Sequence, residues 1–269
     1  MFYRSMESSV DIPSGKLNYT AFGKGQKNLI IIQGLNVRDI KGAGTSLALM
    51  YKMFAEEYRV YFFDRRQSVK EGLTNWDLAD DIYHAMKELN IQSADVFGVS
   101  QGGMIAMALT LEHPECVSKL VLGVTSSRAN ENIKNVIGKW VSCALNKDHI
   151  TINKETFSLM YTDEYLKKYK LFMPLLVRSV KPKNFDRFAI LASAILDFDC
   201  YDRLNEIRCP VLVLGGNKDM ITTGKASVEI AEKLDCEIHM YSEYGHAAYE
   251  EAKDFNSRVY AFLSKQYDK

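Results

Sequence analysis

A single serine stands between two glycines in the segment Gly98-Val99-Ser100-Gln101-Gly102. A serine hydroxyl becomes a nucleophile when a neighbouring base takes its proton, and it can then attack a carbonyl carbon. The Gly-x-Ser-x-Gly pattern is typical of a sharp turn that exposes such a serine, with glycines where strand and helix come too close for a Cβ atom. Because glycine and serine are also common in ordinary turns, the motif needs support from its surroundings.

The residues on either side of Ser100 supply that support. The run at 94–99 is apolar and β-branched, as in a buried strand. The stretch at 101–112 is rich in Ala, Met and Leu with helical spacing, and it stops before Pro114. Strand, sharp turn and helix are the context that the nucleophile requires, so the sequence predicts Ser100 as a catalytic nucleophile.

A serine nucleophile needs a base, and the base needs a carboxylate that holds its tautomer. Asp219 lies four residues beyond the predicted strand at 210–215, and His246 follows the next predicted strand at 237–241. Taken alone, Asp219 fits an ordinary turn and His246 fits the start of a helix. Together, the order Ser, Asp, His on loops that follow strands predicts a catalytic triad of Ser100, Asp219 and His246.

Two backbone N–H groups are expected to stabilise the oxyanion that forms when the serine attacks. One belongs to Gln101, the residue after the nucleophile, and we place the other at Leu35 in the loop Gln33–Asn36. Met220 and Ala247 adjoin the predicted catalytic loops and are predicted as substrate contacts.

Strands and helices alternate through most of the chain. Apolar strands are predicted at 16–22, 28–32, 58–63, 94–99, 119–124, 210–215 and 237–241, and helices at 47–58, 73–90, 101–112, 223–234 and 248–264. This βαβ spacing predicts a mostly parallel sheet with helices on both faces.

Residues 126–200 break that rhythm, because they contain only helix-like stretches. These stretches are Asn132–Leu145, Thr156–Tyr161, Asp163–Val180 and Phe185–Leu196. We therefore expect a catalytic core formed by residues 1–125 and 201–269, with residues 126–200 inserted as a helical cap. Methionine and aromatic side chains at helical spacing in the cap are expected to pack in its core, and a few of them to roof a pocket above Ser100.

Composition excludes several classes of protein. The chain has 269 residues with 34 basic and 34 acidic side chains, and it contains no basic block, which argues against a nucleic-acid partner. No run approaches the roughly 18 apolar residues of a membrane span, and the N-terminus lacks the features of a signal peptide. Five cysteines without a Cys-x-x-Cys pair argue against disulfides and metal sites. We expect a cytoplasmic protein with no membrane partner, and we leave a homodimer open.

Several motifs together resemble those of single-domain α/β-hydrolases with an inserted helical cap. The matching segments are Ile30–Gly34, Phe63–Arg66, Gly98–Gly103 with Ala106, His113–Glu115 with Val117, Leu214–Asp219, and Gly245-His246 with Phe255. The resemblance extends from about Lys16 to Leu263 and is weakest through 126–200. It departs from the family at two points: Gln33 replaces a histidine that usually shapes the oxyanion loop, and a glycine usually found near Gln67 is absent.

The resemblance implies an α/β-hydrolase fold with an eight-stranded sheet, and it implies the same triad and the same N–H donors. It requires no metal and no cofactor. A small-molecule carboxylic ester or lactone is the expected substrate. A carbon–carbon bond hydrolase, or an aminopeptidase resembling the iminopeptidases, would use the same triad. Acidic cap residues could then bind a substrate amine; the candidates are Asp163, Glu164, Asp197, Asp199 and Asp202. The third hypothesis is a non-catalytic ligand-binding protein of the same fold.

Overall fold

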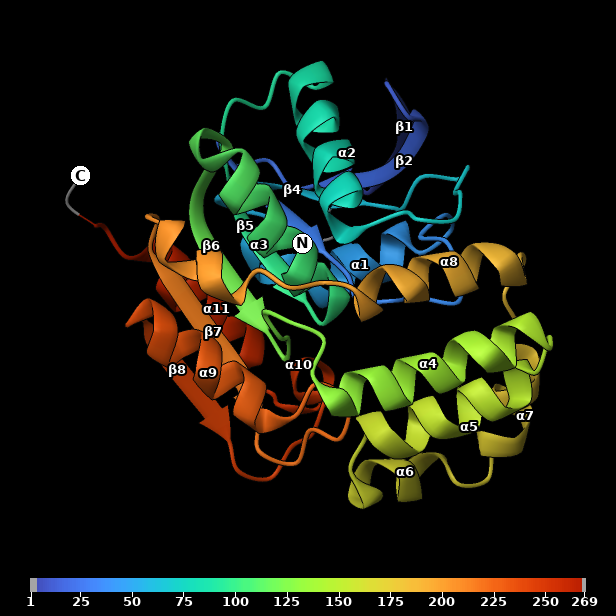
Figure 1. Cartoon of the computed structure of the whole chain (residues 1–269). Coiled ribbons are helices and arrows are strands. Elements are labelled where there is room, and N and C mark those ends of the chain that lie inside the picture. Colours follow the sequence, from blue (N-terminus) through green and yellow to red (C-terminus); the bar gives the residue numbers. More distant parts are fainter. Residues whose placement is uncertain (1–3, 268–269) are drawn as a thin grey trace.

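The computed structural model describes residues 4–267, and its centre is an eight-stranded sheet (Figure 1). The strands are β1 Met6–Ile12, β2 Gly15–Phe22, β3 Lys27–Ile32, β4 Tyr58–Phe63, β5 Ala94–Val99, β6 Val117–Gly123, β7 Val211–Gly216 and β8 Glu237–Tyr241. They lie in the order β1-β2-β4-β3-β5-β6-β7-β8. β2 pairs antiparallel with β1 and with β4, and every other pair is parallel. The expected mostly parallel, eight-stranded α/β-hydrolase sheet is confirmed.

Helices connect the strands and cover both faces of the sheet. The α-helices are α1 Gly44–Met50, α2 Asn75–Glu88, α3 Gln101–Glu112, α4 Glu131–Leu145, α5 His149–Met160, α6 Asp163–Tyr169, α7 Met173–Ser179, α8 Phe185–Leu196, α9 Gly224–Leu234, α10 Ala248–Glu251 and α11 Phe255–Ser264. Short 3₁₀ helices are η1 Lys52–Phe54, η2 Pro114–Cys116 and η3 Tyr201–Glu206. In α2 the N-cap residue Thr74 accepts a hydrogen bond from the Asp77 N–H through its side chain.

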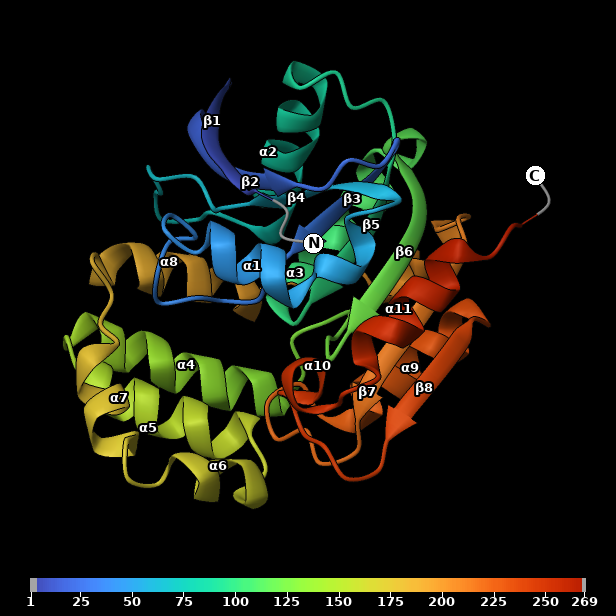
Figure 2. The same cartoon turned by 180° about the vertical axis from the view of Figure 1, so that it is seen from behind.

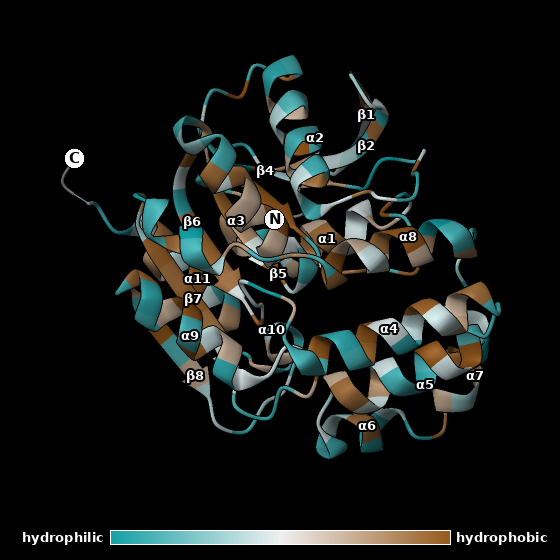
Figure 3. Ribbon diagram, viewed as in Figure 1, coloured by the Kyte–Doolittle hydropathy of each residue, from teal (hydrophilic) through white to brown (hydrophobic). Residues whose placement is uncertain are grey.

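The sheet is buried on both faces because side chains alternate along each strand. In β3, Ile30 and Ile32 pack in the cluster that contains α2, α3 and α9, whereas Leu29 and Ile31 pack with α1 and α11. Figure 2 shows α1 and α11 on the side opposite to α2 and α3. Hydrophobic residues gather in the central strands (Figure 3). All six residues of β5 are buried, so the strand that leads to Ser100 is held in the middle of the core.

The segment between β6 and β7 forms a separate layer of helices, α4 to α8 (Figures 1 and 2). α4 packs along α8 and against α5, and α7 packs against α5. This arrangement supports the expected helical cap over residues 126–200, whose domain boundaries stay a proposal. Within residues 4–267, no helix is both long and apolar enough to cross a bilayer.

The cap helices differ from the predicted ranges in two places. The predicted helix at 163–180 is divided into α6 and α7, because Pro174 lies in the first turn of α7, where its missing N–H costs nothing. α5 begins at His149 instead of Thr156, with the Asp148 carboxylate accepting from the Thr151 N–H at 3.0 Å. Local capping and proline chemistry therefore override the apolar spacing on which the prediction relied.

Three further differences lie in the core. β1 was not among the predicted strands; its mostly exposed residues lack an apolar run, and pairing with β2 holds it in the sheet. The predicted helix at 47–58 ends at Met50 and continues only as η1, where the Phe54 side chain is buried. The last predicted helix, at 248–264, is interrupted between α10 and α11.

Candidate active site

The turn at Ser100 has the geometry that a nucleophile requires. Ser100 joins β5 to α3 with φ 54° and ψ −123°, a region that costs a residue with a side chain about 1–3 kcal/mol. A Cβ on Gly98 would lie 2.4 Å from the carbonyl oxygen of Gly102, and a Cβ on Gly102 would lie 2.0 Å from that of Ile32. Glycine at both positions therefore lets α3 pack directly against β5 and β3, with the serine at the tip of the turn.

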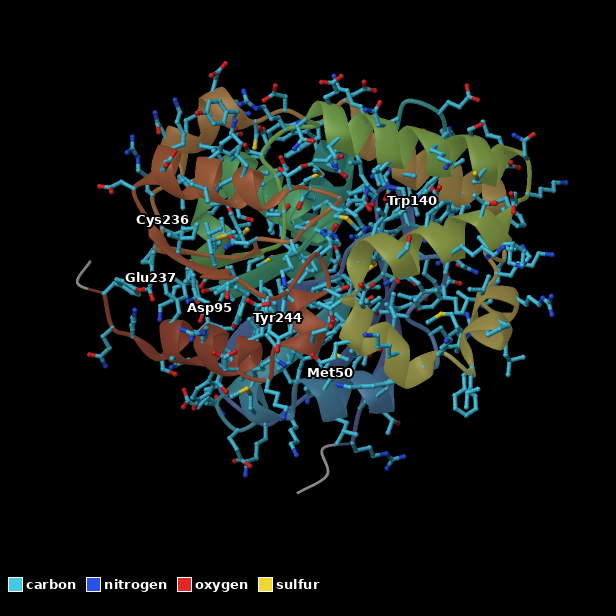
Figure 4. The ribbon with its side chains drawn as sticks, turned by 90° about the horizontal axis from the view of Figure 1, so that it is seen from below. Met50, Asp95, Trp140, Cys236, Glu237 and Tyr244 are labelled. Carbon is cyan, nitrogen blue, oxygen red and sulfur yellow. The ribbon has the colours of Figure 1, made fainter. Side chains whose placement is uncertain are left out.

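The three residues of the predicted triad form one hydrogen-bonded chain. His246 Nε2 lies 2.9 Å from Ser100 Oγ, and His246 Nδ1 lies 2.8 Å from Asp219 Oδ2. Asp219 follows β7 and His246 follows β8, so both side chains come from the carboxyl edge of the sheet. Their loops are joined where the Lys218 N–H donates to the carbonyl oxygen of Tyr244 at 3.0 Å; Tyr244 is labelled in Figure 4.

Asp219 is buried, yet its surroundings favour the carboxylate. Oδ1 accepts from the N–H groups of Ile221 and Thr222 at 2.8 and 3.0 Å, and Oδ2 accepts from the Thr222 hydroxyl at 2.7 Å. Burial raises the pKa of Asp219, but attraction to His246 and these hydrogen bonds outweigh it and hold the pKa below its usual value. Asp219 is therefore ionised at neutral pH and is placed to orient the imidazole and stabilise its cation.

The two predicted oxyanion donors belong to residues that line the same small cavity. Leu35 and Gln101 both line it, and within residues 4–267 neither backbone N–H donates a hydrogen bond. The cavity volume is about 20 Å³, which is room for one water-sized group. A Cβ on Gly34 would lie 3.1 Å from Ser100 Cβ, so the Leu35 loop lies directly against the serine. That both N–H groups point to one oxygen atom stays a prediction.

The sequence matches a family model described as "alpha/beta hydrolase fold" over residues 37–253. This chain belongs to the α/β-hydrolase fold family. Members of the family with related sequences are named as hydrolases, so the protein is an enzyme of the hydrolase class. The hypothesis of a non-catalytic binding protein is therefore not retained.

Two curated relatives and one solved structure illustrate the range of the similarity. A putative carbamate hydrolase RutD of Rhizobium rhizogenes is 26% identical, over 88% of this chain and 92% of that protein. A 2-hydroxy-6-oxononadienedioate/2-hydroxy-6-oxononatrienedioate hydrolase of Paraburkholderia phymatum is 28% identical, over 93% of this chain and 91% of that protein. The enol-lactonase of Burkholderia xenovorans has a TM-score of 0.84 at 19% identity, over 96% of this chain and all of that one, which shows a shared fold.

In this α/β-hydrolase, Arg65 supports the loop in which Gln33 replaces the usual histidine. Arg65 Nη2 donates to the Gln33 carbonyl oxygen at 2.6 Å, and Asn36 Nδ2 donates to Gln33 Oε1 at 3.0 Å. Burial lowers the pKa of Arg65 to about 10, so the guanidinium stays charged at neutral pH. The motif Phe63–Arg66 contained this residue, but only the fold shows that the ends of β3 and β4 bring Arg65 under Gln33.

The cap is tied to the catalytic loops by hydrogen bonds that the sequence did not predict. Gln101 Nε2 donates to the carbonyl oxygen of Leu191 in α8 at 2.8 Å. The hydroxyl and N–H of Thr162 donate to the Glu251 carboxylate at 2.6 and 3.1 Å. Glu251 of α10 thus anchors the cap beside the His246 loop.

The two predicted substrate contacts have different environments. Met220 is 50% exposed, and its carbonyl oxygen accepts from Asn132 Nδ2 at 2.8 Å. Ala247 is fully buried, and its N–H donates to the carbonyl oxygen of Met160 at 2.9 Å. Both residues thus link catalytic loops to the cap, and their contact with substrate stays a prediction.

A larger cavity lies between the core and the cap. Its volume is about 410 Å³, and it is bounded by residues 71–76, α4 and α8, with Trp76 and Phe198 among its apolar walls. Ser100, Asp219 and His246 are not among its lining residues. Asn75 lines the cavity and accepts from Gln101 Nε2 at 3.1 Å, so a buried hydrogen bond connects the cavity wall to the nucleophile turn.

Proposed function

We propose that the protein is a serine hydrolase that cleaves a small carboxylic ester or lactone through an acyl-enzyme on Ser100. The observation that carries the proposal is the continuous chain from Ser100 Oγ through the His246 imidazole to the Asp219 carboxylate, with links of 2.9 and 2.8 Å. These are hydrogen-bond distances for a nucleophile and its base. The ionised Asp219 supplies the third group that a Ser-His-Asp mechanism uses.

In the first half-reaction, Ser100 Oγ attacks the carbonyl carbon while His246 Nε2 accepts the hydroxyl proton. The N–H groups of Leu35 and Gln101 donate to the oxyanion of the tetrahedral intermediate. The intermediate then collapses, and His246 returns the proton to the leaving alcohol oxygen. In the second half-reaction, His246 deprotonates a water that attacks the acyl-enzyme, which releases the acid and restores the Ser100 hydroxyl.

Asp197 lines the larger cavity between core and cap, so an aminopeptidase is kept as an alternative to the proposed ester or lactone hydrolase. Of the acidic cap residues that could bind an amine, Asp163 and Glu164 form the exposed first turn of α6. Asp199 is engaged locally, since its Oδ1 accepts from the Tyr201 N–H at 3.0 Å. The names of related proteins extend the candidate bonds to carbamates and to carbon–carbon bonds beside a ketone, both of which the same nucleophile and oxyanion donors could serve.

The decisive experiment compares wild type with Ser100→Ala on a panel of p-nitrophenyl esters, lactones, aryl carbamates, aminoacyl amides and 2-hydroxy-6-oxo dienoates. We expect the highest kcat/KM on an ester or lactone, and a loss of kcat of about 10⁴-fold or more in Ser100→Ala. Ser158→Ala, which changes an exposed serine of α5, is the matched control and should keep full activity. Circular dichroism checks that each variant is folded.

Labelling with a fluorophosphonate provides a second readout that does not depend on the substrate. Mass spectrometry should locate one adduct on Ser100 in wild type and none in Ser100→Ala. Full activity in Ser100→Ala would refute the acyl-enzyme mechanism. Turnover confined to carbamates, amides or carbon–carbon bonds would instead keep Ser100 as nucleophile and overturn the ester assignment.

A further inference from the structure

The outer edge of the cap combines exposed apolar side chains with basic ones. α6 and α7, with the turn between them, lie at the periphery of the helical layer in Figures 1 and 2. Leu171, Phe172 and Leu175 are 91%, 61% and 66% exposed, and Tyr169 beside them is 41% exposed. Single exposed apolar residues are ordinary, but a contiguous group of this kind marks an interaction site. We call residues 165–183 the cap edge.

The cap edge is strongly basic in a chain that is neutral overall. It contains six basic residues and no acidic one, although the exposed Asp163 and Glu164 of α6 directly precede it; the basic residues are Lys167, Lys168, Lys170, Arg178, Lys181 and Lys183. The remaining residues of the chain therefore carry a net charge of −6. Among residues 4–267, Lys183 is the only one of the six in an ion pair, 3.5 Å from Asp39, and its side chain is still 77% exposed.

This combination is complementary to an anionic lipid surface. Lys and Arg side chains bind lipid phosphates, and leucine and phenylalanine enter the boundary between headgroups and acyl chains. A nucleic acid would use the cations but would leave the apolar side chains without a partner. A twofold dimer through the cap edge would place the same six cations against one another, which opposes self-association.

We propose that the cap edge docks the enzyme on the surface of a membrane that contains anionic lipids. The sequence predicted no membrane partner because no segment can span a bilayer; surface docking needs no such segment. The charge asymmetry turns the basic cap toward the lipid and the acidic remainder away from it. The proposal is independent of the bond that the enzyme cleaves.

The test uses the full chain and vesicles of defined composition. We expect co-sedimentation with phosphatidylcholine vesicles that contain about a quarter phosphatidylglycerol, and little with phosphatidylcholine alone. Binding should weaken as NaCl rises from 0.1 to 1 M, because the screening length falls from about 10 Å to about 3 Å.

Two variants separate the electrostatic contribution to membrane binding from the apolar contribution. The triple variant Lys167→Gln, Lys168→Gln, Lys170→Gln should lower partitioning about a hundredfold. The triple variant Leu171→Ser, Phe172→Ser, Leu175→Ser keeps every charge and should lower it about tenfold or more. The matched control is the double variant Leu49→Ser, Met50→Ser on α1, outside the cap edge. The two side chains are 54% and 51% exposed, and Met50 is labelled in Figure 4. This variant should bind vesicles like wild type.

The rate of hydrolysis of a water-soluble ester should be the same in wild type and all variants, which shows that each is folded. If no ester is hydrolysed, the extent of fluorophosphonate labelling at Ser100 serves the same purpose. Equal binding to both kinds of vesicle, or equal binding by the variants, would overturn the proposal. So would a wild-type dimer in sedimentation velocity that the serine variant abolishes without any vesicle binding. Binding to polyglutamate but to neither vesicle would assign the cap edge to an acidic protein partner instead.

Discussion

α3 in the core and α6 in the cap show how differently the two regions are built. Eleven of the twelve residues of α3 are buried, whereas no residue of α6 is buried. α3 begins at the nucleophile turn and is enclosed on all sides, so its position follows from close packing. α6 lies at the surface of the cap. The proposed nucleophile therefore lies where packing leaves no freedom, and the open cap surface can change without displacing it.

The same contrast appears in two glycines. Gly102 of α3 has no room for a Cβ, whereas a Cβ on Gly138 of α4 would meet no atom within 4 Å. Glycine at 102 is thus required by backbone contact between α3 and β3. Glycine at 138 leaves the helix with an entropic cost that alanine would remove.

Opposite effects on stability at these two glycines are the largest expected difference. Gly102→Ala should lower the free energy of unfolding by about 3 kcal/mol or more, because backbone atoms of β3 must move. Gly138→Ala should raise it by about 0.5–1 kcal/mol. Urea denaturation of both variants measures the difference. Equal stability of Gly102→Ala and wild type would mean that the core is not as closely packed as described.

The next largest effects are expected for two variants that distinguish the role of the Gln33 loop from that of the cap anchor at Glu251. Arg65→Met removes the donor to the Gln33 carbonyl oxygen and should lower kcat about tenfold with little change in KM, since it disturbs one oxyanion donor without removing it. Glu251→Gln weakens the bonds to Thr162 and should change KM by about twofold to threefold with kcat nearly unchanged. Steady-state kinetics on one ester gives both constants. The reverse assignment of kcat and KM effects would refute this division of roles.

The smallest expected effect is the contribution of Asp219 to the pH dependence of stability. Its folded-state pKa lies below the unfolded value of about 3.9, so it stabilises the fold above that pH and loses this contribution as pH falls through the folded pKa. The free energy of unfolding of wild type should therefore fall more steeply below about pH 4 than that of Asp219→Asn. Urea titrations between pH 2.5 and 7 compare the slopes; parallel curves would contradict the ionised, hydrogen-bonded carboxylate.

Much of the core was predictable because its elements carry local signals. Short apolar runs are too short for helices, and their spacing indicated seven of the eight strands. β1 was not predicted, because this exposed edge strand has no apolar run. In the cap, apolar spacing located α4 and α8 but misplaced the start of α5 and missed the break before α7. There, capping by Asp148 and the position of Pro174 decide where the helices begin.

The sequence by itself determined the fold class and the order Ser100, Asp219, His246, because β-strand periodicity, glycine spacing and loop position are local properties of the chain. Only the tertiary structure decided the contacts between distant segments. These include Arg65 under Gln33, Gln101 on Leu191, and Thr162 on Glu251. The tertiary structure also determines that the basic and apolar side chains of the cap edge are exposed. Such contacts depend on how the ends of different strands and helices converge in space, and no local pattern records that convergence.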